Sequence, residues 1–497
     1  MADQSDIEMR INGRAVFAAA AYLISLGVTF ILERIGAPEA LVRNLAPMVA
    51  IAALAMVGVA VRSSRLAAVL SADRAGSPIY AGAALAAIAA GLVVSLSNGP
   101  ASNAPLDALV AGALIGALVI GPLARQTGAS SLSDLLSARF SSRPLRLILA
   151  VAYFAIGAFI AAAGFETAVN AFSSLVGVSR ETAIGVLAAT LLFMIAPGGL
   201  AGLLWTAAAA AGVMLVVALT PIIAHLWSGG SLSEPLWRGG GDAAAALMRG
   251  WPQWGGAEPQ GQGLDAVAAA LGFAALPPFS TAAFASSSSL RAVRAGFVGL
   301  VLAALFALAF FAGGELWQGL GGPAAAGLRA SSGLLIPLIC AAAGVQTASR
   351  AFGVEAAGFG LESVLASRRL ASARQLTILA VALCAFLSYR RDIDPSAALI
   401  AASSLSLALL APALGLALST RAAAVHAEAA IAVSLATIAG LAALQGWISA
   451  ERHAPALALT GAAAGFVIGW ATSLFGGRGK SSARHKLFVE TPLEPGP

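Results

Sequence analysis

Long runs of apolar residues, separated by short polar or basic segments, recur along the whole chain. Most of these runs are long enough to cross about 30 Å of hydrocarbon as an α-helix. The pattern predicts an all-α polytopic membrane protein with about fourteen transmembrane helices. They are expected near residues 15–32, 45–61, 79–97, 106–124, 147–172, 182–197, 203–226, 264–285, 292–313, 333–357, 375–389, 396–418, 427–446 and 456–475.

The composition supports this interpretation. Hydrophobic residues make up 59% of the chain and charged residues 10%, whereas a soluble globular protein carries about 25% charged residues. The longest polar stretch, residues 227–263, is too short to bury a core of its own. The sequence pI of about 10.0 would suit a nucleic-acid partner, but the basic residues stand singly or in pairs beside apolar runs. That distribution is typical of membrane topology, so the expected partner is the lipid bilayer and not nucleic acid.

The loop charges indicate an orientation. Basic residues are roughly twice as numerous in the loops on one side of the spans as on the other, and the more basic side usually faces the cytoplasm. Both termini are therefore expected in the cytoplasm, with the chain in the inner membrane of a bacterium. The first apolar run could instead be a cleaved secretory signal, although acidic residues precede it and no clear A-x-A site follows. Cys340 and Cys384 lie inside apolar runs and are interpreted as packing residues without a disulfide.

One span, residues 264–285, is interrupted by Pro277 and Pro278. Two adjacent prolines remove two backbone donors and clash with the preceding turn, so a helix must break here. One interpretation is a substrate site, because secondary transporters often bind their solute at broken helices near the membrane midplane. The other is a proline kink that Ser280 and Thr281 relieve without any ligand.

A second interruption is expected five spans earlier, at residues 79–97, where Ser77-Pro78 precedes the span and Gly82 and Gly91 lie within it. Because five is an odd number, two consecutive five-span units would cross the membrane in opposite directions and form an inverted repeat. The alternative is a bundle without symmetry. If the repeat exists, the broken first helices meet, and seven residues are predicted to face a central substrate cavity: Gly82, Ala86, Ile88, Pro277, Pro278, Phe279 and Ser280.

Three segments carry a family resemblance. Residues 70–78 read L-S-A-D-R-A-G-S-P, residues 127–140 read T-G-A-S-S-L-S-D-L-L-S-A-R-F, and residues 198–206 read G-G-L-A-G-L-L-W-T. They are similar to the entry of the first core helix, a cytoplasmic segment and the start of the fifth core helix in the bacterial sodium:solute symporter family. The likeness covers most of residues 62–420. It implies the five-plus-five inverted-repeat fold of amino-acid transporters and coupling to sodium.

Other positions depart from the family pattern, which makes the chain a divergent member. After Trp-Thr the family usually continues Asp-x-x-Gln, where this chain has Ala207 and Ala210. A frequent Pro-His in the sixth core helix reads Pro278-Phe279. In the cytoplasmic segment, Ser133 and Asp134 are expected to cap a short amphipathic helix on the membrane surface, with Arg139 in water.

The family's sodium site is altered as well. The resemblance implies that backbone oxygens of the first core helix and a Ser/Thr pair of the eighth hold the ion. The aligned stretch is A-A-G-V-Q-T-A-S-R-A-F, residues 342–352, which places Ala343, Gln346 and Thr347 at the ion positions and Arg350 on the same helix face. A guanidinium is a permanent cation. We therefore expect Arg350 to replace sodium by bonding to carbonyls of the first core helix or to Glu166, and we expect no other cofactor.

Charged residues inside predicted spans are further candidates. Glu166, Arg350 and Glu355 lie where an uncompensated charge costs about 2.5 to 3.5 kcal/mol. They either form ion pairs that orient the bundle or line a transport pathway. The tryptophans of residues 227–263 either anchor that loop at the interface or form a lid. Neither a metal-type histidine spacing nor a nucleophile motif occurs, so an enzyme is not expected.

These observations predict a secondary active transporter that moves a small organic solute by alternating access, with sodium coupling disfavoured. The alternative is a transporter-fold protein that has lost transport and serves as a sensor or as a subunit of a membrane complex with a membrane-protein partner. The expected organisation is two extra helices in 1–61, a first repeat in 62–226, an outer loop in 227–263, a second repeat in 264–420, C-terminal helices in 421–477 and a cytoplasmic tail in 478–497.

Overall fold

The computed structural model describes residues 22–63, 66–74, 76–98, 106–126, 131–140, 142–229, 241, 262–318, 320–355, 366–390, 393–419, 421–445 and 454–475. Within these residues the chain forms helices and no strand. Residues 22–34 are helical. The further elements are α2 (Glu39–Ala60), α3 (Leu66–Ser71), η1 (Ala72–Arg74), α4 (Pro78–Ser97), α5 (Leu106–Ile115), η2 (Gly116–Ile120), α6 (Gly121–Gln126), α7 (Leu132–Phe140), α8 (Arg143–Val176), α9 (Arg180–Ile195), α10 (Leu200–Trp227), α12 (Gln262–Ala274), α13 (Pro277–Ala285), α14 (Ser289–Gln318), α15 (Pro323–Glu355), α16 (Ala366–Arg390), α17 (Pro395–Ala417), α18 (Ala424–Gln445) and α20 (Ala454–Phe475).

Twelve membrane spans are recognisable in the described part of the chain, by the length and apolar character of their helices. Each coincides with one of the fourteen predicted spans. Of the other two, residues 15–32 are described only from residue 22, and residues 182–197 correspond to α9, whose 16 residues are short for a full crossing. The chain is therefore a multi-pass helical membrane protein, and the count of fourteen stays a prediction.

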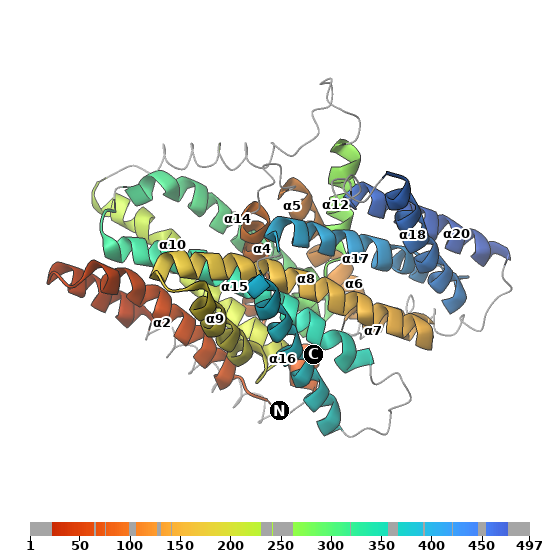
Figure 1. The fold of residues 1–497 in the computed structure, drawn as a ribbon, viewed down its shortest axis with the longest axis horizontal. Helices are drawn as coiled ribbons and strands as arrows, with labels where there is room; N and C mark the ends of the chain where they lie inside the picture. The colour runs from red at the N-terminus through yellow and green to blue at the C-terminus, as the bar shows by residue number, and fades with distance from the viewer. Residues whose placement is uncertain are drawn as a thin grey trace.

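The helices α8 and α15 form the centre of the bundle and pack along each other (Figure 1). Small residues permit this close approach. A Cβ on Gly344 of α15 would lie 2.6 Å from the Cα of Ala161 and 2.6 Å from the carbonyl oxygen of Gly157, both on α8. Side chains larger than hydrogen are thus excluded at this crossing, and van der Waals contact between backbones holds the two helices together.

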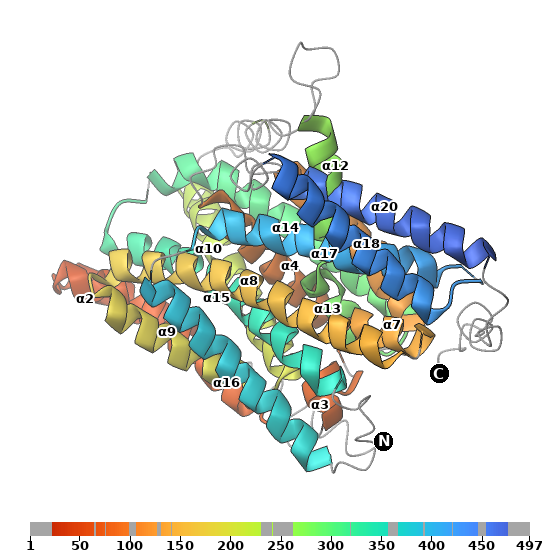
Figure 2. The same ribbon diagram turned by 45° about the vertical axis from the view of Figure 1, so that its right-hand side comes forward.

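The periphery of the bundle is apolar and remains exposed in the absence of lipid. Large side chains such as Ile79, Phe297, Phe386 and Val425 point outward, as expected for residues that face hydrocarbon chains. The C-terminal pair α18 and α20 packs on α17 at one side, away from α2 and α9 at the other, as the two views agree (Figures 1 and 2). The short α3 lies against α16 (Figure 2). Cys340 and Cys384 are free and buried in the core.

Candidate functional site

The first core helix is broken before α4. The helix α3 continues into the single turn η1, and non-helical Gly76 and Ser77 follow. Ala72 and Arg74 have φ values of 52° and 56°, in the left-handed region that non-glycine residues seldom adopt. The side chain of Ser77 then caps α4, and Pro78 occupies its first turn, so this Ser-Pro pair begins a helix.

The helix α4 itself is continuous from Pro78 to Ser97, so the interruption predicted within residues 79–97 is wrong. The described residues of the break, 72–74 and 76–77, precede this helix. Gly82 packs against α14, where a Cβ would come 2.7 Å from Cγ1 of Val298. Ala86 and Ile88 are fully buried in the same helix. These three predicted site residues thus lie in a packed helix beyond the break, and their contact with a solute stays a prediction.

The second broken helix divides where the prolines predict. The helix α12 ends at Ala274, and α13 begins at Pro277 after the extended residue Leu276. Both prolines lie in the first turn of α13, where no intrahelical partner is needed for their missing N–H groups. Such a break requires no strained backbone.

The residues that follow this second break are buried. Phe279 and Ser280 belong to the core, as do both prolines. The Ser280 hydroxyl donates to the Pro277 carbonyl at 2.9 Å, and the Thr281 hydroxyl donates to the Pro278 carbonyl at 2.6 Å. Both hydroxyl protons are therefore used within the first turn, which is the local relief expected of a proline break.

The first break contacts α13 at the end opposite to the second break. The N–H of Gly76 donates to the carbonyl oxygen of Ala285 at 3.1 Å. The first break therefore lies against the C-terminal turn of α13. The adjacent C-terminal part of α15 carries the residues that the resemblance places at the ion site.

At the predicted ion site, a side-chain amide bridges two core helices. Nε2 of Gln346 on α15 donates to the carbonyl oxygen of Val69 on α3 at 3.4 Å, a long hydrogen bond between fully buried groups. The Thr347 hydroxyl donates to the carbonyl of Ala343 at 2.8 Å within α15. The bond expected of Arg350, from the eighth core helix to a carbonyl of the first, is made by Gln346.

Arg350 lies one turn beyond Gln346 and is only 6% exposed. Its guanidinium carbon sits 5.4 Å from the centroid of the Phe284 ring, close to the end of α13, in a cation–π contact. Within the part of the chain that the structure describes, Nε and Nη2 have no hydrogen-bond partner. Glu355 is the last residue of α15, and its side chain lies outside the described residues.

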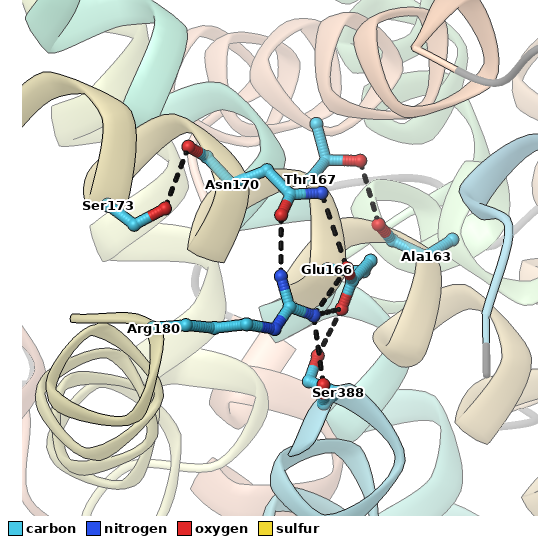
Figure 3. Close-up of polar contacts among 7 residues, drawn as sticks. All are labelled: Ala163, Glu166, Thr167, Asn170, Ser173, Arg180 and Ser388. Carbon is cyan, nitrogen blue, oxygen red and sulfur yellow. Dashed lines mark hydrogen bonds and ion pairs between the residues drawn. The ribbon is translucent and has the colours of Figure 1, made fainter. Parts of the chain in front are cut away.

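Glu166 is paired with Arg180, so the expected bond to Arg350 is wrong. Nη2 of Arg180, at the start of α9, lies 2.6 Å from Oε1 and 2.7 Å from Oε2 of Glu166 on α8 (Figure 3). The Ser388 hydroxyl of α16 donates to Oε2 at 2.7 Å, and Asn170 contacts both partners. This network joins α8, α9 and α16, which supports the ion-pair interpretation of Glu166.

Two further arginines bind helix ends, a role that the sequence did not reveal. Arg125 of α6 donates from Nε and Nη2 to the carbonyls of Ser286 and Ser287, each at 2.7 Å, just after α13. Arg139 of α7 donates from Nε to the Ala417 carbonyl at 3.3 Å and from Nη2 to the Ser419 carbonyl at 2.8 Å, at the end of α17. Cations there complete orphan carbonyls and oppose the helix dipole.

Arg139 therefore departs from the surface helix that was predicted for residues 132–140. Its side chain is buried, which lowers its pKa from the ordinary value, and it does not extend into water. Leu136 is buried too. The cap is Ser131, whose hydroxyl accepts from the Asp134 N–H at 3.0 Å, and not Ser133 or Asp134. Arg139 is buried because it donates to carbonyls at the end of α17, which are distant from it in sequence.

A helical bundle with two broken core helices, in which the first break lies against the helix that follows the second, is a transporter architecture. The family model of the sodium:solute symporter family matches residues 55–330, which is more than half of the chain. The chain belongs to the sodium:solute symporter family. Its relatives in family and fold are transporters and not enzymes.

One of the solved structures similar to this chain supports the fold. A Na+-coupled sialic acid symporter in a substrate-bound, outward-open state is 16% identical and has a TM-score of 0.68, covering 87% of this chain and 97% of its own. A manganese transporter of Eremococcus coleocola is 18% identical with a TM-score of 0.41, covering 83% and 94%. A comparison with curated proteins gave no match. At these identities, the first likeness shows the fold alone.

Proposed function

We propose that this transporter moves a small organic solute by alternating access between two inverted five-helix repeats, and that it does so without sodium. The repeats are α3 to α10 and α12 to α17. Under the repeat, α4, α5 and α10 correspond to α12, α14 and α17, and α8 corresponds to α15. Contacts between these helices then have counterparts between the helices that correspond to them. The contact of α4 with α14 matches that of α12 with α5. The contact of α10 with α4 matches that of α17 with α12, and the contact of α10 with α15 matches that of α17 with α8. Such pairing supports a two-fold relation.

The observation that carries the sodium-independent mechanism is the hydrogen bond from Gln346 to Val69. A sodium ion between these helices would need the carbonyl oxygen of α3 as a ligand, together with hydroxyl oxygens of α15. Here an N–H donor of α15 points at that oxygen. The longer Gln346 side chain, in the place of a serine, both fills the space and satisfies the carbonyl, so the helices are joined without an ion.

Uptake into liposomes by the purified protein tests this mechanism. We expect solute uptake, screened over small carboxylates and amino acids, to proceed at the same rate when external sodium is replaced by N-methylglucamine. We also expect no saturable sodium binding by calorimetric titration. Uptake that requires a sodium gradient would refute the sodium-independent mechanism, as would saturable sodium binding that Thr347→Ala abolishes and Arg350→Ala retains. If no solute in the screen is taken up, the non-transporting alternative is favoured.

We also propose that both termini lie in the cytoplasm. The native cysteines are buried, so an engineered cysteine can be labelled against a low background. Ser228, after α10, and Arg421, before α18, are both exposed. In intact cells, Ser228→Cys should react with an impermeant maleimide, and Arg421→Cys should react only after permeabilisation. The opposite pattern would invert the topology.

A further inference from the structure

The guanidinium of Arg350 presents an empty hydrogen-bonding edge inside the protein. Nε–H and Nη2 lie on the same side of the planar group, and neither has a partner among the described residues although the side chain is only 6% exposed. A buried donor left unsatisfied costs about 1 to 3 kcal/mol, and more if it is charged. A native structure rarely keeps two such donors on one group unless an ion, a water molecule or a ligand completes them.

The other buried arginines of the described residues show how this edge is normally used. In Arg125 and in Arg139, Nε and Nη2 each donate to a backbone carbonyl, so two oxygens fill the edge. Those oxygens belong to the chain itself. The same edge of Arg350 lacks them, and the ligand that matches its two parallel N–H groups best is a group with two coplanar oxygens, such as a carboxylate.

The surroundings hold this edge in place. The guanidinium carbon lies 5.4 Å from the centroid of the Phe284 ring, and the ring offers no hydrogen-bond acceptor atom to Nε or Nη2. Gln346, one turn away on α15, is fixed to α3, and the end of α13 is fixed to the first break through Gly76 and Ala285. Asp134 and Tyr153 act electrostatically on Arg350, but neither accepts a hydrogen bond from Nε or Nη2.

We propose that the Nε–Nη2 edge of Arg350 binds a carboxylate of the transported solute, where α15 lies beside the C-terminal turn of α13 and the first break. This inference rests on the proposed transport function and narrows its substrate class to organic anions. Arg350 then acts as a binding residue for the solute, and the sodium position is satisfied separately by Gln346. Because the donor edge is bidentate, a neutral amide of the same shape binds more weakly than the carboxylate.

Formate is the appropriate probe, since it is the smallest carboxylate and needs no knowledge of the rest of the solute. Purified protein in detergent is titrated with potassium formate, which replaces potassium chloride at constant ionic strength, and Tm is followed. We expect a saturable rise in Tm that formamide does not produce. Arg350→Gln should weaken formate binding by about tenfold or more, as for loss of a charge-assisted hydrogen-bonded pair.

Two variants provide controls. Arg350→Lys keeps the charge and loses the bidentate edge, so it should also bind formate more weakly, and it serves if Arg350→Gln does not fold. Arg329→Gln, which removes an exposed arginine from the same helix, should bind formate like wild type. Equal effects of formate and chloride, or formate binding that both Arg350 variants retain, would overturn the proposal. Binding found only in Asp134→Asn would show that Asp134 fills the edge, and would overturn it too.

This titration does not depend on transport. Solute uptake without formate binding at Arg350 would leave the transporter function standing and reject the carboxylate site. Formate binding at Arg350 without uptake of any anionic solute in the liposome screen would show an adventitious anion site, and would reject the assignment of this edge to the solute.

Discussion

Replacing Glu166 by Gln is expected to lower the free energy of unfolding by about 3 kcal/mol, the low end of the range for breaking a buried ion pair. The carboxylate accepts from Arg180 with both oxygens and from Ser388, and the two ionised side chains are 8% and 15% exposed. A glutamine at this position can offer one oxygen and leaves the guanidinium charge without its counterion. The lost free energy comes from the contacts that join α8, α9 and α16.

Reversible unfolding in mixed micelles measures this effect, and Glu39→Gln supplies a control. Glu39 is an exposed carboxylate in the first turn of α2, so its replacement should change stability by less than about 1 kcal/mol. In a double-mutant cycle with Arg180→Ala, the two losses should be far from additive, because each variant removes the same interaction. Additive losses, or a Glu166→Gln protein as stable as the control, would show that the network contributes little.

Gly344→Ala is the second change with a large expected effect, a loss of about 2 to 3 kcal/mol from one methyl group. The new Cβ would collide with backbone atoms of Ala161 and Gly157, which cannot rotate away as a flexible side chain can. The helices α8 and α15 would have to move apart along their crossing. Backbone contact between them, and every residue that α15 positions, would then be disturbed.

Gly212→Ala separates this effect from helix propensity. Gly212 lies within α10, and an added Cβ there meets no atom within 4 Å. This variant should be unchanged or more stable by up to about 1 kcal/mol, since alanine favours a helix over glycine. Thermal unfolding of both proteins in the same detergent compares them directly. If the Gly344→Ala protein had the same Tm as the Gly212→Ala protein, this result would contradict the close packing of α8 and α15.

Sequence patterns predicted the spans well because hydrophobic length is a local property. Every one of the twelve recognised spans coincides with an apolar run of the sequence. The prolines at 277 and 278 likewise identified the break between α12 and α13, since the missing N–H groups act on their own helix. The first break was misplaced because Ser77-Pro78 was taken as an interruption. The same dipeptide caps and starts a helix, and the break consists of the residues before it.

The partners of the polar residues could not be predicted, because they lie on different helices. Arg180, at the start of α9, binds the carboxylate of Glu166 on α8. Gln346 meets Val69 at a separation of 277 residues. Arg139 lies in a segment with surface-helix periodicity, and only the carbonyls at the end of α17 explain its burial. Tertiary contacts, not local pattern, decided these three positions.

The hydrogen bond from Gln346 to Val69 has a thermodynamic consequence for any solute that crosses this membrane. An ion that joins two helices can be taken up on one side and released on the other, and its own gradient then drives the cycle. An amide that belongs to the chain cannot leave, so its occupancy is the same at every salt concentration and membrane potential. Under the sodium-independent mechanism proposed above, a carrier held together in this way transmits no free energy from the sodium gradient. Unless another gradient is coupled to it, such a carrier brings its solute to equal electrochemical potential on the two sides, in whichever direction the solute's own gradient points.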